Sequence, residues 1–178
     1  PGALPALVVA VAAGGTAARN SALSLVTIAE AGPGLAQRVA EAPGALLALI
    51  AALANGGDVT QNSARTLMGI VEAGPGLAQR VTGTPGALPA LVAAVAAGGA
   101  VAHICTGVLM QIATAGPGLA QRVAAAPGAL PALFAAVAAG GAAAPNSLQA
   151  LASIAKGDQG LRSASPGPQG RCRRCSPR

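Results

Sequence analysis

An internal repeat of 42 residues limits what this chain can fold into more than any other feature of the sequence. Four closely similar heptapeptides, PGALPAL or PGALLAL, begin at Pro1, Pro43, Pro85 and Pro127. The nonapeptide AGPGLAQRV recurs unchanged at the same spacing, at residues 31–39, 73–81 and 115–123. A period of this length is typical of proteins in which every copy is one supersecondary unit that stacks on its neighbours. We therefore divide the chain into units that begin at residues 1, 43, 85 and 127.

Each unit contains three stretches with the properties of short helices. In the first unit, one apolar stripe with helical spacing consists of Leu4, Leu7, Val8 and Val11. A second stripe consists of Ala18, Ala22, Leu25 and Ala29. Glycines follow both stripes and predict the helix ends, and a short third helix is predicted over residues 35–41. Because none of these helices can bury its apolar face alone, the sequence predicts an all-α solenoid of nearly four three-helix repeats.

The residues of each unit resemble the armadillo repeat. The segment GALPALVAAVAAGG, at 86–99, looks like the second helix of that repeat, and VTQNSARTLMGI, at 59–70, looks like the third. GLAQRVAEA, at 34–42, resembles the short first helix and its closing alanine. The resemblance covers residues 1–161, phased so that the chain starts at a second helix. It implies a right-handed superhelix whose third helices line a concave groove that holds a partner.

The positive charge of the chain is concentrated at its end. The sequence carries 11 basic and 5 acidic residues, but residues 1–160 hold six of the bases and all five acids. The basic surplus, and with it the isoelectric point near 11.1, therefore comes from a tail and not from a basic domain. Residues 162–178, rich in Pro, Ser, Gly and Arg, predict a disordered basic tail, although a translated intron or a frameshift would look the same.

Composition argues against catalysis and against nucleic-acid reading. The sequence has one His, one Phe and neither Trp nor Tyr, which leaves little material for general acid–base chemistry or base stacking. We therefore expect no enzyme, no cofactor and no specific nucleic-acid partner. The apolar run 87–97 is short of the roughly 20 residues that span a bilayer, so no membrane span is expected. No signal peptide is visible after Pro1, and we expect the chain to be a fragment.

Two small groups of reactive residues were weighed as sites. His103 and Cys105 are two apart on a helix and point about 200° away from each other, so we expect a groove-side His and a buried Cys instead of a dyad. Cys172 and Cys175 form one CxxC pair where a metal site needs about four ligands, so no metal is expected. The arginines beside that pair leave open a phosphate-binding or nuclear-import patch.

The copies differ mainly in one helix. Units one and three are identical at 29 of 42 positions, and 11 of the 13 differences fall at unit positions 16–30, the third helix of the armadillo pattern. A solenoid can vary the face that meets partners while it keeps its packing surfaces, although drift on a tolerant exposed face would give the same pattern. The stripe at positions 19, 20, 23, 27 and 30 supplies the candidate groove residues. These are Arg19, Asn20, Leu23, Thr27, Gln61, Asn62, Arg65, His103, Gln111, Asn146, Gln149 and Ser153.

One departure from the resemblance bears on the ligand. Importin-alpha-like armadillo proteins carry Trp and Asn four apart on this helix, where they hold an extended basic peptide. The matching pairs here are Leu23 and Thr27, Arg65 and Gly69, Gly107 and Gln111, and Gln149 and Ser153. We therefore do not expect nuclear-import cargo binding of that kind, and the nearly neutral stripe gives no charge preference.

The sequence favours a protein–protein interaction scaffold that holds an extended peptide or a partner helix in the groove. The alternative is a piece of an armadillo-containing ubiquitin ligase or kinase whose catalytic domain lies elsewhere. A third class, an Ala-rich structural or membrane-surface protein, also fits the composition. We expect a monomer in the cytoplasm, with the nucleus as the alternative compartment.

Overall fold

The computed structural model describes residues 2–164 of the chain, and the side chains of residues 2–158. This part contains eleven helices and no strand, which confirms the predicted all-α solenoid. The helices are α1 (Ala3–Ala13), α2 (Gly15–Glu30), α3 (Pro33–Glu41), α4 (Ala45–Ala52), α5 (Gly57–Glu72), α6 (Pro75–Gly83), α7 (Ala87–Ala97), α8 (Gly99–Thr114), α9 (Pro117–Ala125), α10 (Ala129–Ala139) and α11 (Ala143–Ala164).

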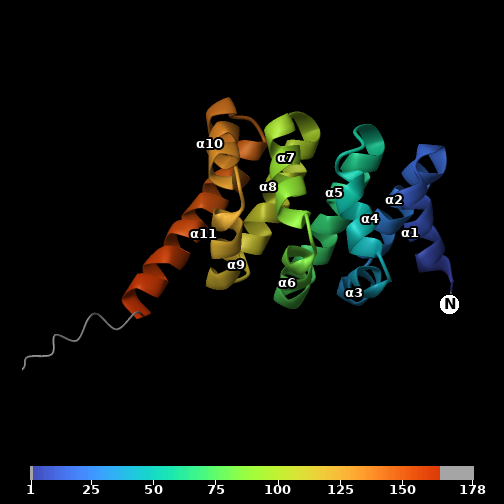
Figure 1. Ribbon diagram of the computed structural model, residues 1–178, viewed down its shortest axis with the longest axis horizontal. Helices are drawn as coiled ribbons and strands as arrows, with labels where there is room; N and C mark the ends of the chain where they lie inside the picture. The colour runs from blue at the N-terminus through green and yellow to red at the C-terminus, as the bar shows by residue number, and fades with distance from the viewer. Residues whose placement is uncertain (1, 165–178) are drawn as a thin grey trace, which may run out of the picture.

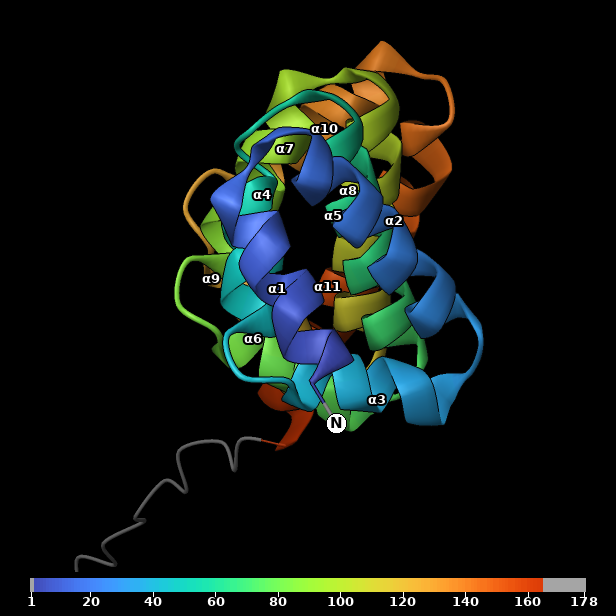
Figure 2. The same cartoon turned by 90° about the vertical axis from the view of Figure 1, so that its right-hand side faces the viewer.

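The units stack side by side, so that equivalent helices form three parallel rows. One row contains α1, α4, α7 and α10, and another contains the short helices α3, α6 and α9 (Figure 1). The third row, which we call the ladder, contains α2, α5, α8 and α11, each packed against the next. Seen along the stacking direction, α1 lies in front of α4 and α7 (Figure 2). The short helices follow one edge of the stack, the lower edge in Figure 1. The ladder is therefore one continuous surface built from all four units.

Glycine and proline set the helix boundaries that the sequence predicted. Gly14, with φ 80° and ψ −170°, joins α1 to α2 in a conformation that residues with a Cβ rarely adopt. Pro33 begins α3, two residues before the predicted start, because the first helical position needs no N–H donor. The second unit departs from the others, since α4 already ends at Ala52. There the Thr60 hydroxyl donates to the Ala52 carbonyl at 2.9 Å and satisfies one of the acceptors freed at the helix end.

The last helix is longer than the sequence analysis expected. Each earlier unit has a proline at position 33, and the fourth unit has Gln159 there. Without a proline to disfavour helical backbone before it, α11 continues to Ala164, three residues past the expected end of the array at 161. Residues 165–178, most of the expected tail, lie outside the described residues, so disorder there stays a prediction.

The core is aliphatic and repeats from unit to unit. Equivalent positions are filled by Leu25, Leu67 and Leu109 in the ladder and by Leu49, Leu91 and Leu133 in the row of α4, α7 and α10, and all six are fully buried. Burying such a side chain stabilises the fold by about 1.5–3 kcal/mol. Buried alanines, among them Ala22 and Ala64 in the ladder and Ala78 in α6, let neighbouring helices approach closely. The core therefore needs no aromatic residue.

Between residues 2 and 164, no single helix combines the length and apolar character needed to cross a bilayer. Two helix pairs, α3 with α4 and α9 with α10, reach that length and composition only jointly, across bends of 91° and 90°.

Candidate binding face

The ladder carries all twelve predicted groove residues at its surface or half-buried in it. Eight are exposed and four are half-buried. The exposed ones are Arg19, Asn20, Leu23, Thr27, Gln61, Arg65, His103 and Gln149, and the half-buried ones are Asn62, Gln111, Asn146 and Ser153. Since none of these side chains belongs to the buried core, all twelve residues have access to solvent.

A hollow of about 370 Å³ crosses the ladder at its centre. Its lining comes from all four ladder helices: Glu30, Gln61, Arg65, Met68, Gly69, Glu72, His103, Ile104 and Asn146. Four of these nine were predicted site residues, and the other eight predicted residues lie elsewhere on the ladder. Four further lining residues occupy positions of the same stripe, so the sequence pattern could have identified them. These are Glu30, Gly69, Glu72 and Ile104. Met68 lies outside the stripe, at the unit position where the first unit buries Val26.

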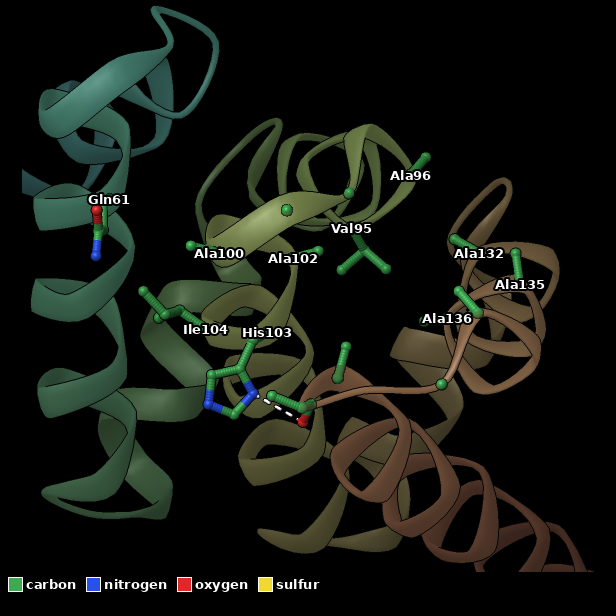
Figure 3. A pocket seen from close by; sticks show the side chains of 16 residues that line it. Gln61, Val95, Ala96, Ala100, Ala102, His103, Ile104, Ala132, Ala135 and Ala136 are labelled. Carbon is green, nitrogen blue, oxygen red and sulfur yellow. Dashed lines mark hydrogen bonds between the residues drawn. The ribbon is translucent and has the colours of Figure 1, made fainter.

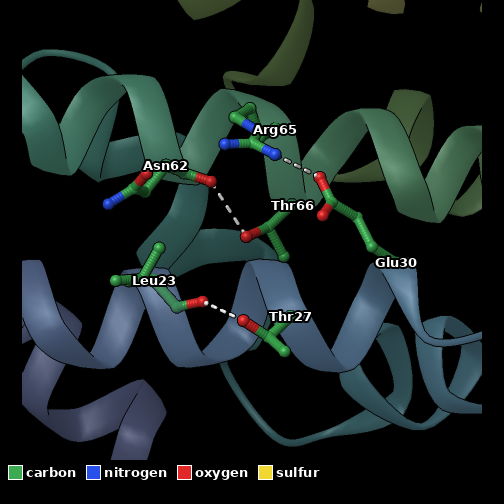
Figure 4. A network of polar contacts seen from close by, with 6 residues as sticks. All are labelled: Leu23, Thr27, Glu30, Asn62, Arg65 and Thr66. Carbon is green, nitrogen blue, oxygen red and sulfur yellow. Dashed lines mark hydrogen bonds and ion pairs between the residues drawn. The ribbon is translucent and has the colours of Figure 1, made fainter.

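Ion pairs between the first two ladder helices cancel most of the local charge. Arg65 Nη2 lies 2.7 Å from Glu30 Oε1, and Arg19 Nε lies 2.9 Å from Asp58 Oδ2 (Figure 4 shows the first pair). All four side chains are about half exposed, so solvent screens these contacts. The nearly neutral groove expected from the sequence thus has a structural cause, which is pairing between units.

Hydroxyl groups of this surface are occupied by their own helices. Thr27 Oγ1 donates to the Leu23 carbonyl at 3.1 Å, and Thr66 Oγ1 donates to the Asn62 carbonyl at 2.9 Å (Figure 4). Ser153 Oγ donates to the Gln149 carbonyl in the same manner. Within residues 2–158, the side-chain amides of four predicted groove residues make no hydrogen bond and can still both donate and accept: Asn20, Gln61, Asn62 and Gln149.

His103 connects the third unit to the fourth. Its Nδ1 lies 2.9 Å from the carbonyl oxygen of Ala142, so Nδ1 carries the proton that it donates (Figure 3). Asn146 Nδ2 donates in return to the His103 carbonyl at 3.4 Å. Cys105 is fully buried on the other side of α8, and burial raises the pKa of its thiol to about 12. The predicted arrangement, an exposed His and an inert buried Cys, is confirmed, and the two form no dyad.

A second, apolar hollow of about 580 Å³ adjoins the first. It lies between α7, α8, α10 and the start of α11, and alanines from these helices make up much of its wall (Figure 3). Gln61, His103 and Ile104 line both hollows. The two hollows are therefore neighbours, one with charged and polar residues over α5 and the other apolar toward α10.

No cluster of three or more metal-binding side chains occurs among the residues that the structure covers. Cys172 and Cys175 lie outside them.

Comparison with known proteins gives the fold. The chain matches no protein-family model and no curated protein. Two designed armadillo repeat proteins, one of them computationally designed for modular peptide recognition, are each 25% identical to it with a TM-score of 0.78, and the match covers 90% of this chain and 70% of theirs. A designed armadillo repeat protein in complex with the peptide (KR)4 is 24% identical with a TM-score of 0.78, over 91% of this chain and 70% of its own. The chain has an armadillo-like repeat fold, as its sequence predicted.

Proposed function

We propose that this chain is a binding scaffold whose ladder holds an extended peptide across the two neighbouring hollows. The observation that carries the proposal is that the helix in which the copies differ most supplies the lining of a depression shared by all four units. Variation is thus concentrated where a ligand would lie. The armadillo-like neighbour designed for modular peptide recognition, and the one in complex with a peptide, add support from their own descriptions.

The chemistry of the ladder suits a peptide backbone. The free amides of Gln61 and Asn62 can pair with both the N–H and the C=O of an extended chain, which has no partner strand of its own. The alanine-lined hollow beyond His103 accepts one large apolar side chain of the peptide. Because Arg65 and Arg19 are paired within the protein, we expect a ligand with little net charge.

The dimensions of the ladder set the length of the ligand. Packed helices lie about 8–10 Å apart, so four ladder helices span about 24–30 Å. An extended chain covers this distance with roughly seven to nine residues, at about 3.4 Å for each. Catalysis is no part of the proposal, since the His and the Cys within the described residues point apart.

Peptide display with a matched pair of variants tests the proposal. A library of random nonapeptides is selected on the full chain, and the selected peptides are measured by fluorescence anisotropy. Gln61→Ala with Arg65→Ala removes two exposed ladder side chains, and we expect at least tenfold weaker binding. Gln79→Ala with Arg80→Ala removes the same two residue types from the exposed surface of α6, and binding should persist. Equal loss from both pairs, or no loss from the ladder pair, would refute the proposal.

A further inference from the structure

The row of α1, α4, α7 and α10 contains no polar or charged side chain in any of its helices. Unit positions 5, 9, 12 and 13 of this row are exposed in all four units and follow helical spacing. In the first unit these positions hold Pro5, Val9, Ala12 and Ala13. Among all sixteen residues at these positions, Asn55 is the only polar one. We call this exposed apolar surface the outer face.

The outer face lies on the side of the stack away from the ladder. Seen along the stack, α1, α4 and α7 lie on one side and α2, α5 and α8 on the other (Figure 2). Large side chains contribute to the face, since Val9 is 68% exposed and Leu47 is 54% exposed. The two middle helices, α4 and α7, present it as the outer two do, so it is a property of the repeat. An apolar surface that is kept through every unit indicates a place of contact.

The charged side chains are divided unequally between the two sides. The short helices beside the outer row carry three exposed arginines, Arg38, Arg80 and Arg122, and one acid, Glu41. The ladder carries three bases and four acids within residues 2–158. Arg80 adjoins the outer face directly, because it lines a hollow of about 500 Å³ together with Leu47. The apolar face therefore has a basic edge, whereas the opposite side of the molecule is slightly acidic.

The size of the outer face argues against a second copy of the chain as its partner. Packed helices lie about 8–10 Å apart and eleven residues of helix are about 16 Å long, so the face measures roughly 400–500 Å². Two copies paired through it would bury roughly 800–1,000 Å² in total, less than the ~1,200 Å² of a stable interface. A second copy would also bring the same excess of arginines. A lipid surface needs no minimum area and supplies anionic groups.

We propose that the outer face lies against the surface of a membrane that contains anionic lipids. The apolar side chains would rest at the boundary between headgroups and acyl chains, and the arginines of the short helices would pair with lipid phosphates and carboxylates. The contact is peripheral, and no helix crosses the bilayer. The ladder then points away from the membrane, so this proposal does not depend on the peptide site and leaves that site open.

Co-sedimentation with vesicles tests the proposal. The full chain should pellet with vesicles of phosphatidylcholine and phosphatidylserine mixed at about 7:3, and much less with phosphatidylcholine alone. Leu47→Glu places a charge in the outer face and should weaken this binding roughly tenfold. Leu148→Glu in α11 is the matched control, because Leu148 is 55% exposed and Leu47 is 54% exposed. The control should bind like the parent, and circular dichroism should show the same helix content in all three proteins.

A second pair of variants tests the basic edge. Arg80→Gln removes one positive charge beside the outer face and should weaken binding to the anionic vesicles about fivefold. Lys156→Gln removes one positive charge from the exposed surface of α11 and should leave the binding unchanged. Binding of the parent should also fall as NaCl is added, since salt screens the attraction between arginines and headgroups.

Each of four results would overturn the proposal. The parent might fail to pellet with the anionic vesicles. Equal losses in the two leucine variants would show that only net charge matters. A Leu47→Glu variant that binds like the parent would assign the lipid contact to another part of the chain, such as the arginines of residues 171–178. A parent that sediments as a dimer while Leu47→Glu sediments as a monomer would mean that a second copy covers the outer face.

Discussion

The contact between the first two ladder helices and the contact between the last two use the same backbone but different chemistry. Between α2 and α5, paired charges join the units at the surface, through Arg19 with Asp58 and Arg65 with Glu30. Between α8 and α11, the His103 ring and the Asn146 amide bond to backbone carbonyls, next to an alanine-lined hollow. The repeat thus preserves the packed core and leaves the exposed edge of each contact free to change.

The middle of the ladder shows how one substitution reshapes this edge. Gly107 stands where the first two units have Leu23 and Arg65, and a Cβ built there would lie 3.0 Å from Met68 Cε and 3.3 Å from Asn146 Nδ2. The thioether of the second unit and the amide of the fourth therefore both approach the third unit at this glycine. A residue without a side chain in one unit thus leaves room for a side chain from each of its two neighbours.

The largest effect should come from the core that both contacts share. Leu25→Ala in α2 and Leu109→Ala in α8 should each lower the free energy of unfolding by about 3 kcal/mol, because each empties a fully buried site. Urea denaturation followed by circular dichroism gives both values, with the exposed Leu23→Ala as the control. Losses that differ by more than 1–2 kcal/mol would show that the two contacts do not share one core.

A buried hydroxyl distinguishes the contacts at unit position 21. Ser63 Oγ in α5 is buried without a hydrogen-bond partner, whereas Ser147 Oγ in α11 donates to the Ala143 carbonyl at 2.9 Å. Ser63→Ala should therefore raise the free energy of unfolding, by about 1 kcal/mol, since it removes an unsatisfied polar atom. Ser147→Ala should not raise the free energy of unfolding, because the hydroxyl that it removes is hydrogen-bonded. Thermal melts of both variants decide the point, and a destabilised Ser63→Ala would contradict it.

The third unit places Cys105 at this same position, and its thiol should make stability depend on alkaline pH. Its pKa is raised from 9.0 to about 12 in the folded protein, so the unfolded chain releases the proton first. The stabilisation is complete below pH 9 and is lost as pH rises toward 12, by about 1 kcal/mol at pH 10. Melting curves from pH 8 to 11 should show a steeper fall for the parent than for Cys105→Ala. Identical slopes would mean that the thiol is not buried.

The hydrogen bond of His103 should contribute less to the free energy of unfolding, and salt should not change this contribution. His103→Ala removes a hydrogen bond to the Ala142 carbonyl and should cost about 0.5–1 kcal/mol of unfolding free energy. Denaturation at low salt and in 1 M NaCl should give the same difference from the parent. A difference that disappears in salt would indicate charge instead of the hydrogen bond.

The smallest effect should come from the ion pair at the other contact. Arg65→Ala breaks an exposed pair with Glu30 and should cost about 0.5 kcal/mol or less, and still less in 1 M NaCl. The same pair of denaturation experiments measures it. A salt-independent loss of more than 1 kcal/mol would show that Arg65 packs against the ladder in addition to pairing.

The sequence alone determined the period, the three helices of each of the first three units and the core positions. These depend on local properties: glycine and proline end helices wherever they occur, and apolar spacing repeats with the unit. The sequence also indicated the long α11, since Gln159 replaces the proline of the earlier units. The repeat array was nevertheless expected to end at residue 161, three residues before the end of α11.

Only the tertiary structure decided which surface residues meet. Twelve stripe positions were correctly placed outside the core, but only four of them line the central hollow, which Met68 also joins. Two contacts join residues from different units: the pairing of Arg65 with Glu30, and the hydrogen bond of His103 to Ala142. The exposure of Phe134 becomes clear only when its unit is compared with the others. Spacing within one unit fixes the direction of a side chain, but what it touches depends on the size of the side chains in the next unit.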